Sequence, residues 1–408
     1  MPSKSKNTQL ETADLFTKCS QFTTAREVMA AGYYPYFRAI SSSMGDEVIV
    51  AGKKMIMIGS NNYLGLVSDP RVKEAAAEAT LKYGSGCTGS RFLNGTLDLH
   101  EELEERLARY MKREAALVFS TGFQTNLGTI SSLVGKDDII LIDRSNHASI
   151  VDGCRLSYGK VYKYAHNDMK DLERVIKIAM QNGLRGGMLI ITDGVFSMEG
   201  DIVDLPPLQE VAEKYGARVM VDDAHSVGVL GDGGRGTAEH YGLIDKIDLT
   251  MGTFSKSLAS LGGFIAGDES VIHYIKHFAR SLIFSASIAP ANAAAVLKAL
   301  DIIEAEPERR ENLWKNTRKM HRGFKDMGFN IGTSQTPVVP IHIGEDMACF
   351  KFWRALSDEG IFANAAIPPA VAPGRTLIRT SYTATHTDTQ LDRVLDTFHR
   401  LGKKYGII

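Results

Sequence analysis

The chain has 408 residues, of which 44% are hydrophobic and 23% are charged, and its formal net charge is -1. This composition is typical of a soluble globular protein with two or more domains, and the near-zero charge gives no electrostatic reason to expect nucleic-acid binding. The sequence lacks an apolar run of about 18 residues, and the polar start at residues 2–7 lacks an apolar signal core, so we expect no transmembrane segment. The four cysteines lie far apart without ligand spacing, which argues against a metal site and favours the reducing cytoplasm.

The start of the chain predicts an N-terminal arm over residues 1–58. After a flexible tail, a helix is expected at residues 12–31, ended by Gly32. Residues 47–58 contain two strand-like runs around a glycine-containing turn, which is typical of a hairpin.

Residues 59–289 alternate between short apolar runs and amphipathic helical patterns, which predicts a large α/β domain with a mainly parallel sheet. Helices are expected at 70–83, 97–111, 169–181, 205–215 and 270–284, and strands at 115–119, 139–142, 161–164, 188–192, 218–221, 247–251 and 263–266.

Residues 290–408 predict a smaller α+β C-terminal domain. Helices are expected at 290–304, 307–327, 346–359 and 387–401, with strands at 338–343 and 376–380.

Lys256 follows the strand-like run at 247–251 and precedes Gly262 and Gly263, so we expect it on a loop beside the sheet. A lysine amine in a partly desolvated pocket has a lowered pKa and can form a Schiff base with an aldehyde such as that of pyridoxal 5'-phosphate (PLP). Taken alone, Lys256 would be read as a solvated lysine. Its neighbours change that interpretation.

Two residues upstream match the needs of the PLP ring. Asp222 ends the apolar run at 218–221, and a carboxylate at a strand end would keep the pyridine nitrogen protonated. His225 is close enough in sequence to contact the phenolic oxygen of the ring. Asp222 by itself could be an ordinary turn residue, but D-x-A-H placed 34 residues before the lysine favours a cofactor site.

Other polar residues are suited to the phosphate group. Thr253 and Ser255 flank the lysine and can hydrogen-bond phosphate oxygens. The run S-T-G-F-Q-T-N at 120–126, with Gly122 and Phe123, is typical of a glycine turn that opens a helix, and helix N-termini bind phosphate. Such turns are more common as simple helix caps, so this signal is weak alone.

These residues resemble those of the α-oxoamine synthases, PLP-dependent enzymes of fold type I (aspartate aminotransferase-like) that condense an amino acid with an acyl-CoA and release carbon dioxide. The resemblance covers residues 33–401. It includes S-N-N-Y-L-G-L at 60–66, D-R-S-N-H-A-S-I-V-D at 143–152, D-G-V-F-S-M-E-G at 193–200, V-D-D-A-H-S at 221–226 and G-T-F-S-K-S at 252–257.

The resemblance implies further site residues. His147 would stack on the PLP ring and hydrogen-bond the substrate carboxylate, and Ser197 would contact the phenolic oxygen of PLP. Arg379, within the strand-like run L-I-R-T-S, would grip the carboxylate through two parallel hydrogen bonds. Without the resemblance, a lone histidine after a strand is more often structural, and an arginine can form a surface salt bridge. The catalytic set implied is Lys256, His147, Asp222 and His225.

The family also implies a homodimer with shared active sites. Ser285 would reach across the dimer to the phosphate, and Asn62 and Arg91 lie on stretches that approach the active site, where they would contact substrate.

Residues 84–96 (G-S-G-C-T-G-S-R-F-L-N-G-T) resemble the soluble homodimeric bacterial serine palmitoyltransferases. The implied substrates are L-serine and palmitoyl-CoA, and the product is 3-oxosphinganine, a lipid that would bring a cytoplasmic protein to a membrane surface. Two alternatives within the family are glycine C-acetyltransferase and 8-amino-7-oxononanoate synthase. A non-catalytic subunit, or another PLP reaction on the same fold, is a further alternative.

Overall fold

The computed structural model describes residues 14–408, so the expected N-terminal tail lies outside the described residues. The single helix predicted over residues 12–31 is wrong in the described part. Two short helices, α1 (Thr17–Ser20) and α2 (Thr24–Ala30), occupy it instead. The hydroxyl of Thr23, at the start of α2, donates to Glu27 Oε1 over 2.6 Å, and threonine is better suited to such a helix start than to a helix interior.

The predicted hairpin is confirmed as strands β1 (Glu47–Val50) and β2 (Lys53–Met57), which pair antiparallel. Ala51 and Gly52 join them with φ angles of 50° and 76°, the left-handed conformations that a two-residue hairpin turn requires. Strand β2 also pairs in parallel with β11 (Ile361–Phe362). The hairpin is therefore joined to the C-terminal part of its own chain.

A seven-stranded sheet forms the centre of the larger part of the molecule, with the order β3-β9-β8-β7-β6-β4-β5. Only β9 runs antiparallel to its neighbours, which confirms the mainly parallel sheet. The strands are β3 (Ala115–Phe119), β4 (Ile139–Asp143), β5 (Lys160–Tyr164), β6 (Met188–Asp193), β7 (Arg218–Asp222), β8 (Leu249–Thr253) and β9 (Gly263–Gly267).

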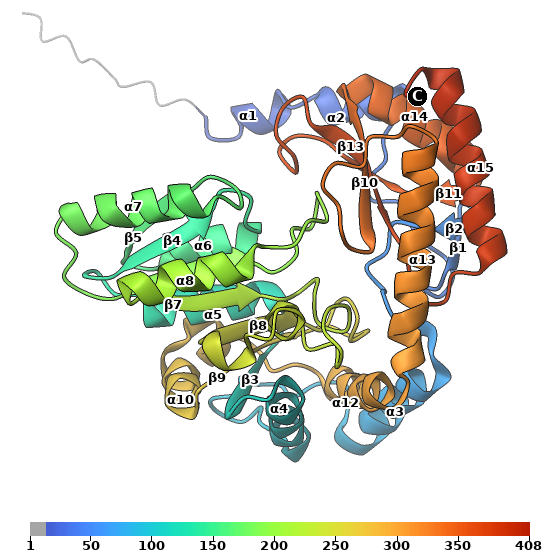
Figure 1. The fold of residues 1–408 in the computed structure, drawn as a ribbon. Helices are drawn as coiled ribbons and strands as arrows, with labels where there is room; N and C mark the ends of the chain where they lie inside the picture. The colour runs from blue at the N-terminus through green and yellow to red at the C-terminus, as the bar shows by residue number, and fades with distance from the viewer. Residues whose placement is uncertain (1–13) are drawn as a thin grey trace, which may run out of the picture.

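Helices cover both faces of this sheet because successive strand residues point to opposite sides. In β4, Ile140 and Ile142 pack on the side of α5 (Gly122–Leu133), α6 (Ala148–Leu156) and α10 (Glu269–Phe278). Ile139 and Leu141 pack on the side of α7 (Met169–Gln181) and α8 (Leu205–Tyr215). Figure 1 shows these two helices alongside the sheet.

The helix predicted over residues 270–284 is also corrected. It is divided into α10 and α11 (Arg280–Ile283) because Ala279 adopts an extended conformation, with φ -71° and ψ 103°. Helices α3 (Pro70–Tyr83), α4 (Asp98–Met111) and α12 (Pro290–Ala305) pack together beside β3 and β9. The short elements η1 (Leu66–Ser68), α9 (Thr237–His240) and η2 (Ile244–Lys246) lie in the connections.

The C-terminal part has a three-stranded antiparallel sheet of order β10-β13-β12. It comprises β10 (Val338–Gly344), β12 (Asn364–Ala366), β13 (Thr376–Ser381), α13 (Pro307–Asp326), α14 (Asp346–Asp358) and α15 (Asp388–Tyr405). Its core also contains Ile56 and Ile58 from the N-terminal arm. The domain boundaries at residues 58 and 289 stay predictions. Along the described part of the chain, we find no helix with both the length and the apolar character needed to cross a membrane.

Candidate active site

A cavity of about 300 Å³ opens at the carboxyl ends of β4, β6, β7 and β8. This edge of an open parallel sheet is where ligands bind in folds of this type. The predicted site residues that line it are Gly122, Phe123, His147, Ser197, Asp222, His225, Thr253, Ser255 and Lys256.

Lys256 lies on the turn that follows β8 and lines this cavity. Part of its side chain faces the open space, yet protein atoms surround the amine. This desolvation lowers the pKa of Lys256 to about 8, and Asp222 opposes the shift while Arg379 adds to it. An appreciable fraction of the amine is therefore neutral, and nucleophilic, near physiological pH.

Asp222 ends β7, the strand next to β8, and it is 3% exposed. Its Oδ1 accepts a hydrogen bond from Ala224 N at 3.0 Å, and its Oδ2 accepts one from Asn126 Nδ2 at 2.7 Å. Asp193 ends the neighbouring strand β6. Burial, followed by the nearby charge of Asp222, raises the pKa of Asp193 well above its usual value.

His147 begins α6, and two groups of Ser149 contact its ring. Ser149 N donates to His147 Nδ1 at 3.2 Å, and Ser149 Oγ lies 2.7 Å from the same nitrogen. Asn126 Nδ2 in turn donates to Ser149 Oγ at 2.8 Å. Because Nδ1 accepts, neutral His147 carries its proton on Nε2. Desolvation lowers the pKa of His147, which favours this neutral form.

His225 belongs to a second network that reaches the C-terminal part of the chain. Its Nδ1 lies 2.7 Å from the hydroxyl of Tyr63, and Asn61 Oδ1 accepts from Arg379 Nη2 at 2.9 Å and from Tyr63 at 3.4 Å. Burial lowers the pKa of His225 well below its usual value and raises that of Tyr63 to about 12. Neutral His225 can therefore hydrogen-bond a ring oxygen without carrying charge.

Arg379 does not line the cavity itself, but its guanidinium touches the cavity wall. Arg379 Nε donates to Ser197 O at 2.6 Å, and Nη1 donates to Ser381 Oγ at 3.0 Å. The side chain comes from β13 and is 5% exposed. Arg379 thus connects the C-terminal sheet to the segment that carries Ser197.

The N-terminus of α5 forms a cradle that fits a phosphate. The Thr121 hydroxyl caps the helix by accepting a hydrogen bond from Gln124 N at 3.1 Å. The N–H groups of Gly122 and Phe123 belong to the first turn, where backbone N–H groups have no carbonyl partner inside the helix. A Cβ added to Gly122 would lie 2.8 Å from Thr253 Oγ1, so the backbone approaches that hydroxyl closely. Thr253 Oγ1 lies 3.0 Å from Ser255 Oγ.

The residues present therefore fit PLP. Backbone N–H groups and two hydroxyls would hold the phosphate, Asp222 would hold the pyridine nitrogen, and Lys256 would hold the aldehyde carbon.

Three predicted residues lie away from the cavity of this chain. Ser285 Oγ accepts from Gln124 Nε2 at 2.9 Å. Asn62 Nδ2 donates to Met44 O at 3.3 Å, and Arg91 forms two hydrogen bonds to Glu104, at 2.7 and 3.0 Å. Their roles in binding stay predictions.

The sequence interpretation missed Asn126, Ser149, Asp193 and Tyr63. A signal existed for Asn126, because it lies one helical turn after Gly122 and must share its face. Ser149 follows His147 by two residues, where a serine can bond back to the preceding side chain at a helix start.

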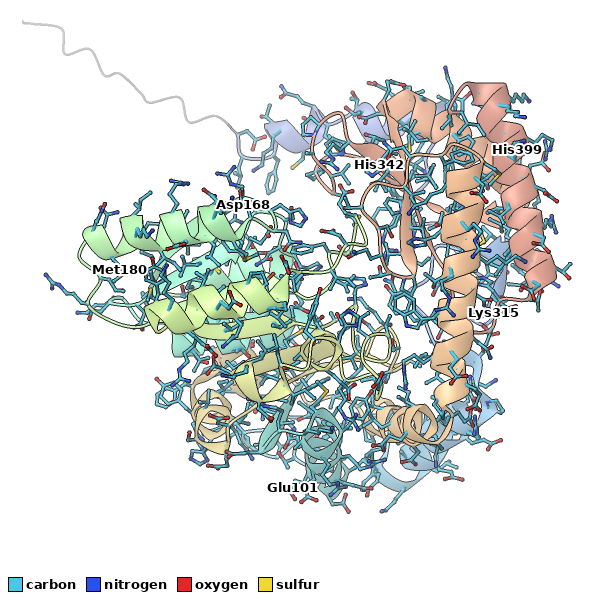
Figure 2. All side chains as sticks on the ribbon, in the orientation of Figure 1. Glu101, Asp168, Met180, Lys315, His342 and His399 are labelled. Atoms are coloured by element: carbon cyan, nitrogen blue, oxygen red, sulfur yellow. The ribbon has the colours of Figure 1, made fainter. Side chains whose placement is uncertain are left out.

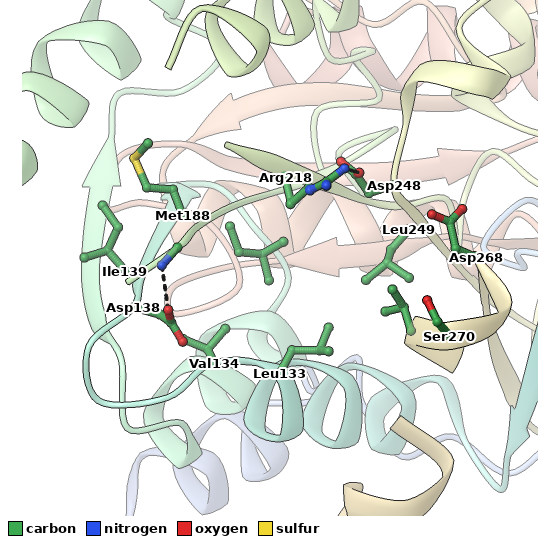
Figure 3. A pocket seen from close by; sticks show the side chains of 13 residues that line it. Leu133, Val134, Asp138, Ile139, Met188, Arg218, Asp248, Leu249, Asp268 and Ser270 are labelled. Carbon is green, nitrogen blue, oxygen red and sulfur yellow. Dashed lines mark hydrogen bonds and ion pairs between the residues drawn. The ribbon is translucent and has the colours of Figure 1, made fainter. Parts of the chain in front are cut away.

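A second cavity, of about 390 Å³, lies at the opposite edge of the same sheet (Figure 3). The strands β4, β6 and β7 begin there, at Ile139, Met188 and Arg218. Its charged groups already have partners: Arg218 with Asp248 at 2.6 Å, Asp268 with Arg113 at 3.5 Å, and Asp138 with the backbone N–H of Gly187 at 2.6 Å. The chemistry therefore centres on the Lys256 cavity.

The strand order, together with the positions of Lys256 and Asp222 at the ends of adjacent strands, defines a class of protein: the PLP-dependent enzymes of fold type I. The family model described as aminotransferase class I and II matches residues 53–398, and the chain belongs to this family.

Individual relatives agree with this assignment. The chain is 52% identical to a serine palmitoyltransferase of Sphingobacterium spiritivorum, over 96% of this chain and 98% of the relative. It is 44% identical to an 8-amino-7-oxononanoate synthase of Symbiobacterium thermophilum, over 93% and 96% of the two chains. The solved structure of a serine palmitoyltransferase of S. paucimobilis, with a PLP–myriocin adduct bound, superposes with a TM-score of 0.92 at 36% identity, covering 97% of this chain and all of that one. The predicted fold class and the resemblance to the α-oxoamine synthases are confirmed.

Proposed function

We propose that the protein is a PLP-dependent serine palmitoyltransferase, which condenses L-serine with palmitoyl-CoA to give 3-oxosphinganine, CoA and carbon dioxide. The observation that carries this proposal is the end-to-end identity of 52% with a serine palmitoyltransferase. The site supports the chemistry, because it places a lysine of lowered pKa beside an aspartate and within reach of an arginine from the other part of the chain.

Bound PLP would supply an electron sink that makes the α-hydrogen of an attached amino acid acidic. Lys256 would hold the cofactor through its amine and, as a free amine, would accept the proton from Cα of the bound serine. A pKa of about 8 suits this role, since the free amine can accept a proton near neutral pH. Asp222 would keep the pyridine nitrogen protonated, and its two hydrogen bonds from Ala224 and Asn126 hold its carboxylate in place.

Arg379 and His147 would bind the serine carboxylate. A guanidinium can hold a carboxylate with two parallel hydrogen bonds, and Arg379 is already oriented by Ser197 O and Asn61. His147, neutral and protonated on Nε2, would present an N–H donor. Holding the carboxylate at both groups would fix which bond at Cα is broken first.

A second candidate is 8-amino-7-oxononanoate synthase, which would use alanine and pimeloyl-CoA. The 44% identity to such an enzyme over 93% of the chain favours it next. Glycine C-acetyltransferase, which would use glycine and acetyl-CoA, would need the same catalytic residues. The retained Lys256 makes a non-catalytic subunit the weaker alternative.

The test is CoA release by purified PLP-loaded protein with serine, alanine or glycine, each combined with palmitoyl-, pimeloyl- or acetyl-CoA. Release that requires both serine and palmitoyl-CoA is expected. Release with alanine plus pimeloyl-CoA, or with glycine plus acetyl-CoA, would contradict the substrate assignment and leave the site residues in place.

We also propose that the enzyme is a cytoplasmic homodimer whose lipid product brings it to the membrane surface. Exposed apolar side chains next to two residues of the expected shared site support the dimer: Phe92 and Leu93 follow Arg91, and Phe284 precedes Ser285, at 53%, 78% and 74% exposure. Sedimentation equilibrium should give twice the chain mass, and a monomer of full activity would contradict the shared site. Sedimentation with lipid vesicles tests the membrane contact.

A further inference from the structure

His166 lies between two carboxylates outside the site described above. Its Nδ1 is 3.1 and 3.3 Å from the two oxygens of Asp143, which ends β4. Its Nε2 is 2.9 Å from Asp201 Oδ2, in the segment after β6. Asp143 is 1% and Asp201 6% exposed. Both ring nitrogens therefore face a buried carboxylate.

This geometry favours a charged imidazole between two ionised carboxylates. A neutral imidazole has one nitrogen that can only accept, and a lone pair facing a carboxylate oxygen is repulsive. Burial alone would lower the pKa of His166, but the hydrogen bonds to Asp143 and Asp201 outweigh it and raise the pKa to about 10. Glu199, on the same segment as Asp201, adds a further negative charge nearby. The two carboxylates therefore favour the cationic form of His166 at physiological pH.

The segment held at Asp201 carries Ser197 into the cavity. Phe196 N donates to Asp201 O at 3.0 Å, Gly200 N donates to Phe196 O at 2.8 Å, and Val203 N donates to Gly194 O at 3.0 Å, so residues 194–203 form a closed loop. The edge of the His166 ring also packs against Phe196, with ring centroids 4.4 Å apart. Ser197 O, next in the chain, accepts from Arg379 Nε.

The carboxylate of Asp143 holds the turn that leads to His147. Its Oδ1 accepts from Ser145 N at 2.8 Å, and its backbone oxygen accepts from Asn146 N at 3.2 Å. Asn146 Oδ1 accepts from Asp193 N at 3.2 Å, and His147 N donates to Asp193 Oδ2 at 2.8 Å. The turn and the loop enter the cavity from different strands, and the ion pairs of His166 add a second link between them beside the bonds at Asp193.

We propose that His166 is a positioning residue: by holding Asp143 and Asp201 together, it fixes the turn that carries His147 and the loop that carries Ser197 in one arrangement around the cavity. Without this cation, the Asp201 carboxylate would lose the partner of its Oδ2 and the Asp143 carboxylate would keep only backbone N–H donors, so the link between the two segments would weaken. The inference rests on the proposed function only where serine binding is measured. The positions of His147 and Ser197 matter to any PLP reaction at this site, so the PLP measurements do not depend on the substrate.

The test compares His166→Gln and Asp201→Asn with His399→Gln. His399 lies on α15, in the C-terminal part of the molecule (Figure 2), and its Nδ1 is buried without a partner among the described residues, so this variant controls for the loss of a packed imidazole. PLP affinity is measured by titrating the apo-protein, and L-serine affinity by the absorbance change of the PLP-loaded protein. The KM for palmitoyl-CoA is measured in parallel.

We expect His166→Gln and Asp201→Asn to weaken PLP and serine binding by about tenfold, since a hydrogen bond to a charged group contributes roughly the free energy of a tenfold change in affinity. The KM for palmitoyl-CoA should stay within about twofold, as should all values for His399→Gln. Binding of PLP and serine at wild-type affinity in both test variants would overturn the inference.

A measurement on the unaltered protein tests the inference even if the variants fail to fold. The nitrogen NMR signals of His166 should report two protonated nitrogens at pH 8, and a neutral ring at that pH would overturn the inference. If no amino acid plus palmitoyl-CoA released CoA, the proposed function would fail, while the PLP titration and the NMR signals would still decide the role of His166.

Discussion

At the scale of single residues, the environment of Lys256 sets when it can react. Its pKa of about 8 results first from desolvation in the cavity. Below this pH the protonated amine cannot attack an aldehyde, whereas above it the amine is free. The rate of PLP capture by the apo-protein should therefore rise about tenfold per pH unit up to about pH 7, and level off above pH 8. Stopped-flow absorbance measures this rate. A rate that still rises at pH 10 would indicate an ordinary exposed lysine.

Asp222 should control the chemistry more than the affinity. In Asp222→Asn the side chain keeps its size and one oxygen, so the hydrogen bond from either Ala224 or Asn126 can persist and PLP should still bind. The amide cannot hold a proton on the pyridine nitrogen, and we expect kcat to fall by roughly a hundredfold or more. Steady-state kinetics at saturating serine and palmitoyl-CoA measure this. Asp222→Glu is the control that keeps the charge, and normal turnover in Asp222→Asn would refute the assigned role.

The sequence could identify Asp222 and Lys256 together because Asp222 ends β7 and Lys256 lies on the turn that follows the neighbouring parallel strand β8. The strand pattern plus a spacing of 34 residues is enough to bring them to one edge of a sheet. Asn126 and Ser149 could not be found this way. Asn126 reaches Asp222 only through the orientation of α5 on the sheet, which depends on packing that one sequence does not display, whereas Ser149 contacts His147 locally at the start of α6.

At the scale of elements, the hydrophobic pattern predicted the regular helices and strands, but it did not predict where a helix is interrupted or where very short strands form. The pattern of residues 270–284 continues across Ala279, where the backbone is extended. Strands β11 and β12 are two and three residues long, too short to give a period. Such short strands exist because β2 and β13 offer them partners from elsewhere in the chain.

The start of α5 gives a prediction at this scale. Gly122→Ala would place a Cβ 2.8 Å from Thr253 Oγ1, so the hydroxyl or the first helical turn must move. We expect PLP to bind about tenfold more weakly, because the displaced hydroxyl or N–H groups would no longer match the phosphate oxygens. Titration of the apo-protein with PLP measures the effect. Gly187→Ala, at the opposite edge of the sheet, meets its nearest atom at 3.6 Å and should bind PLP normally. Equal affinities in the two variants would contradict the cradle.

At the scale of the whole molecule, the N-terminal arm packs against the C-terminal part of the chain. Ile56 and Ile58 of the arm lie in one core with Trp353, Leu356 and other residues of the C-terminal part. Strand β2, which contains Ile56, pairs with β11, and Ser381 N donates to Ile58 O at 2.7 Å. The predicted boundary at residue 58 therefore marks a position along the sequence, and packed contacts extend across it. The contacts suggest that the hairpin and the C-terminal part unfold together.

This cooperation can be measured with tryptophan fluorescence, because the chain has two tryptophans and Trp353 packs in the core that contains Ile56. In a Trp314→Phe background, Ile56→Ala should lower the unfolding free energy reported by Trp353 in urea by about 2–4 kcal/mol, the cost of a cavity in a packed core. Val48→Ala tests the same cooperation from a site that does not touch Trp353, since Val48 lies in the same hairpin but in a separate cluster with Val50, Met55 and Met57. It should also shift the Trp353 transition, because a cavity anywhere in one cooperative unit lowers the shared unfolding free energy. If Ile56→Ala left that transition unchanged, the arm would unfold independently, and the predicted boundary at residue 58 would then separate two folding units.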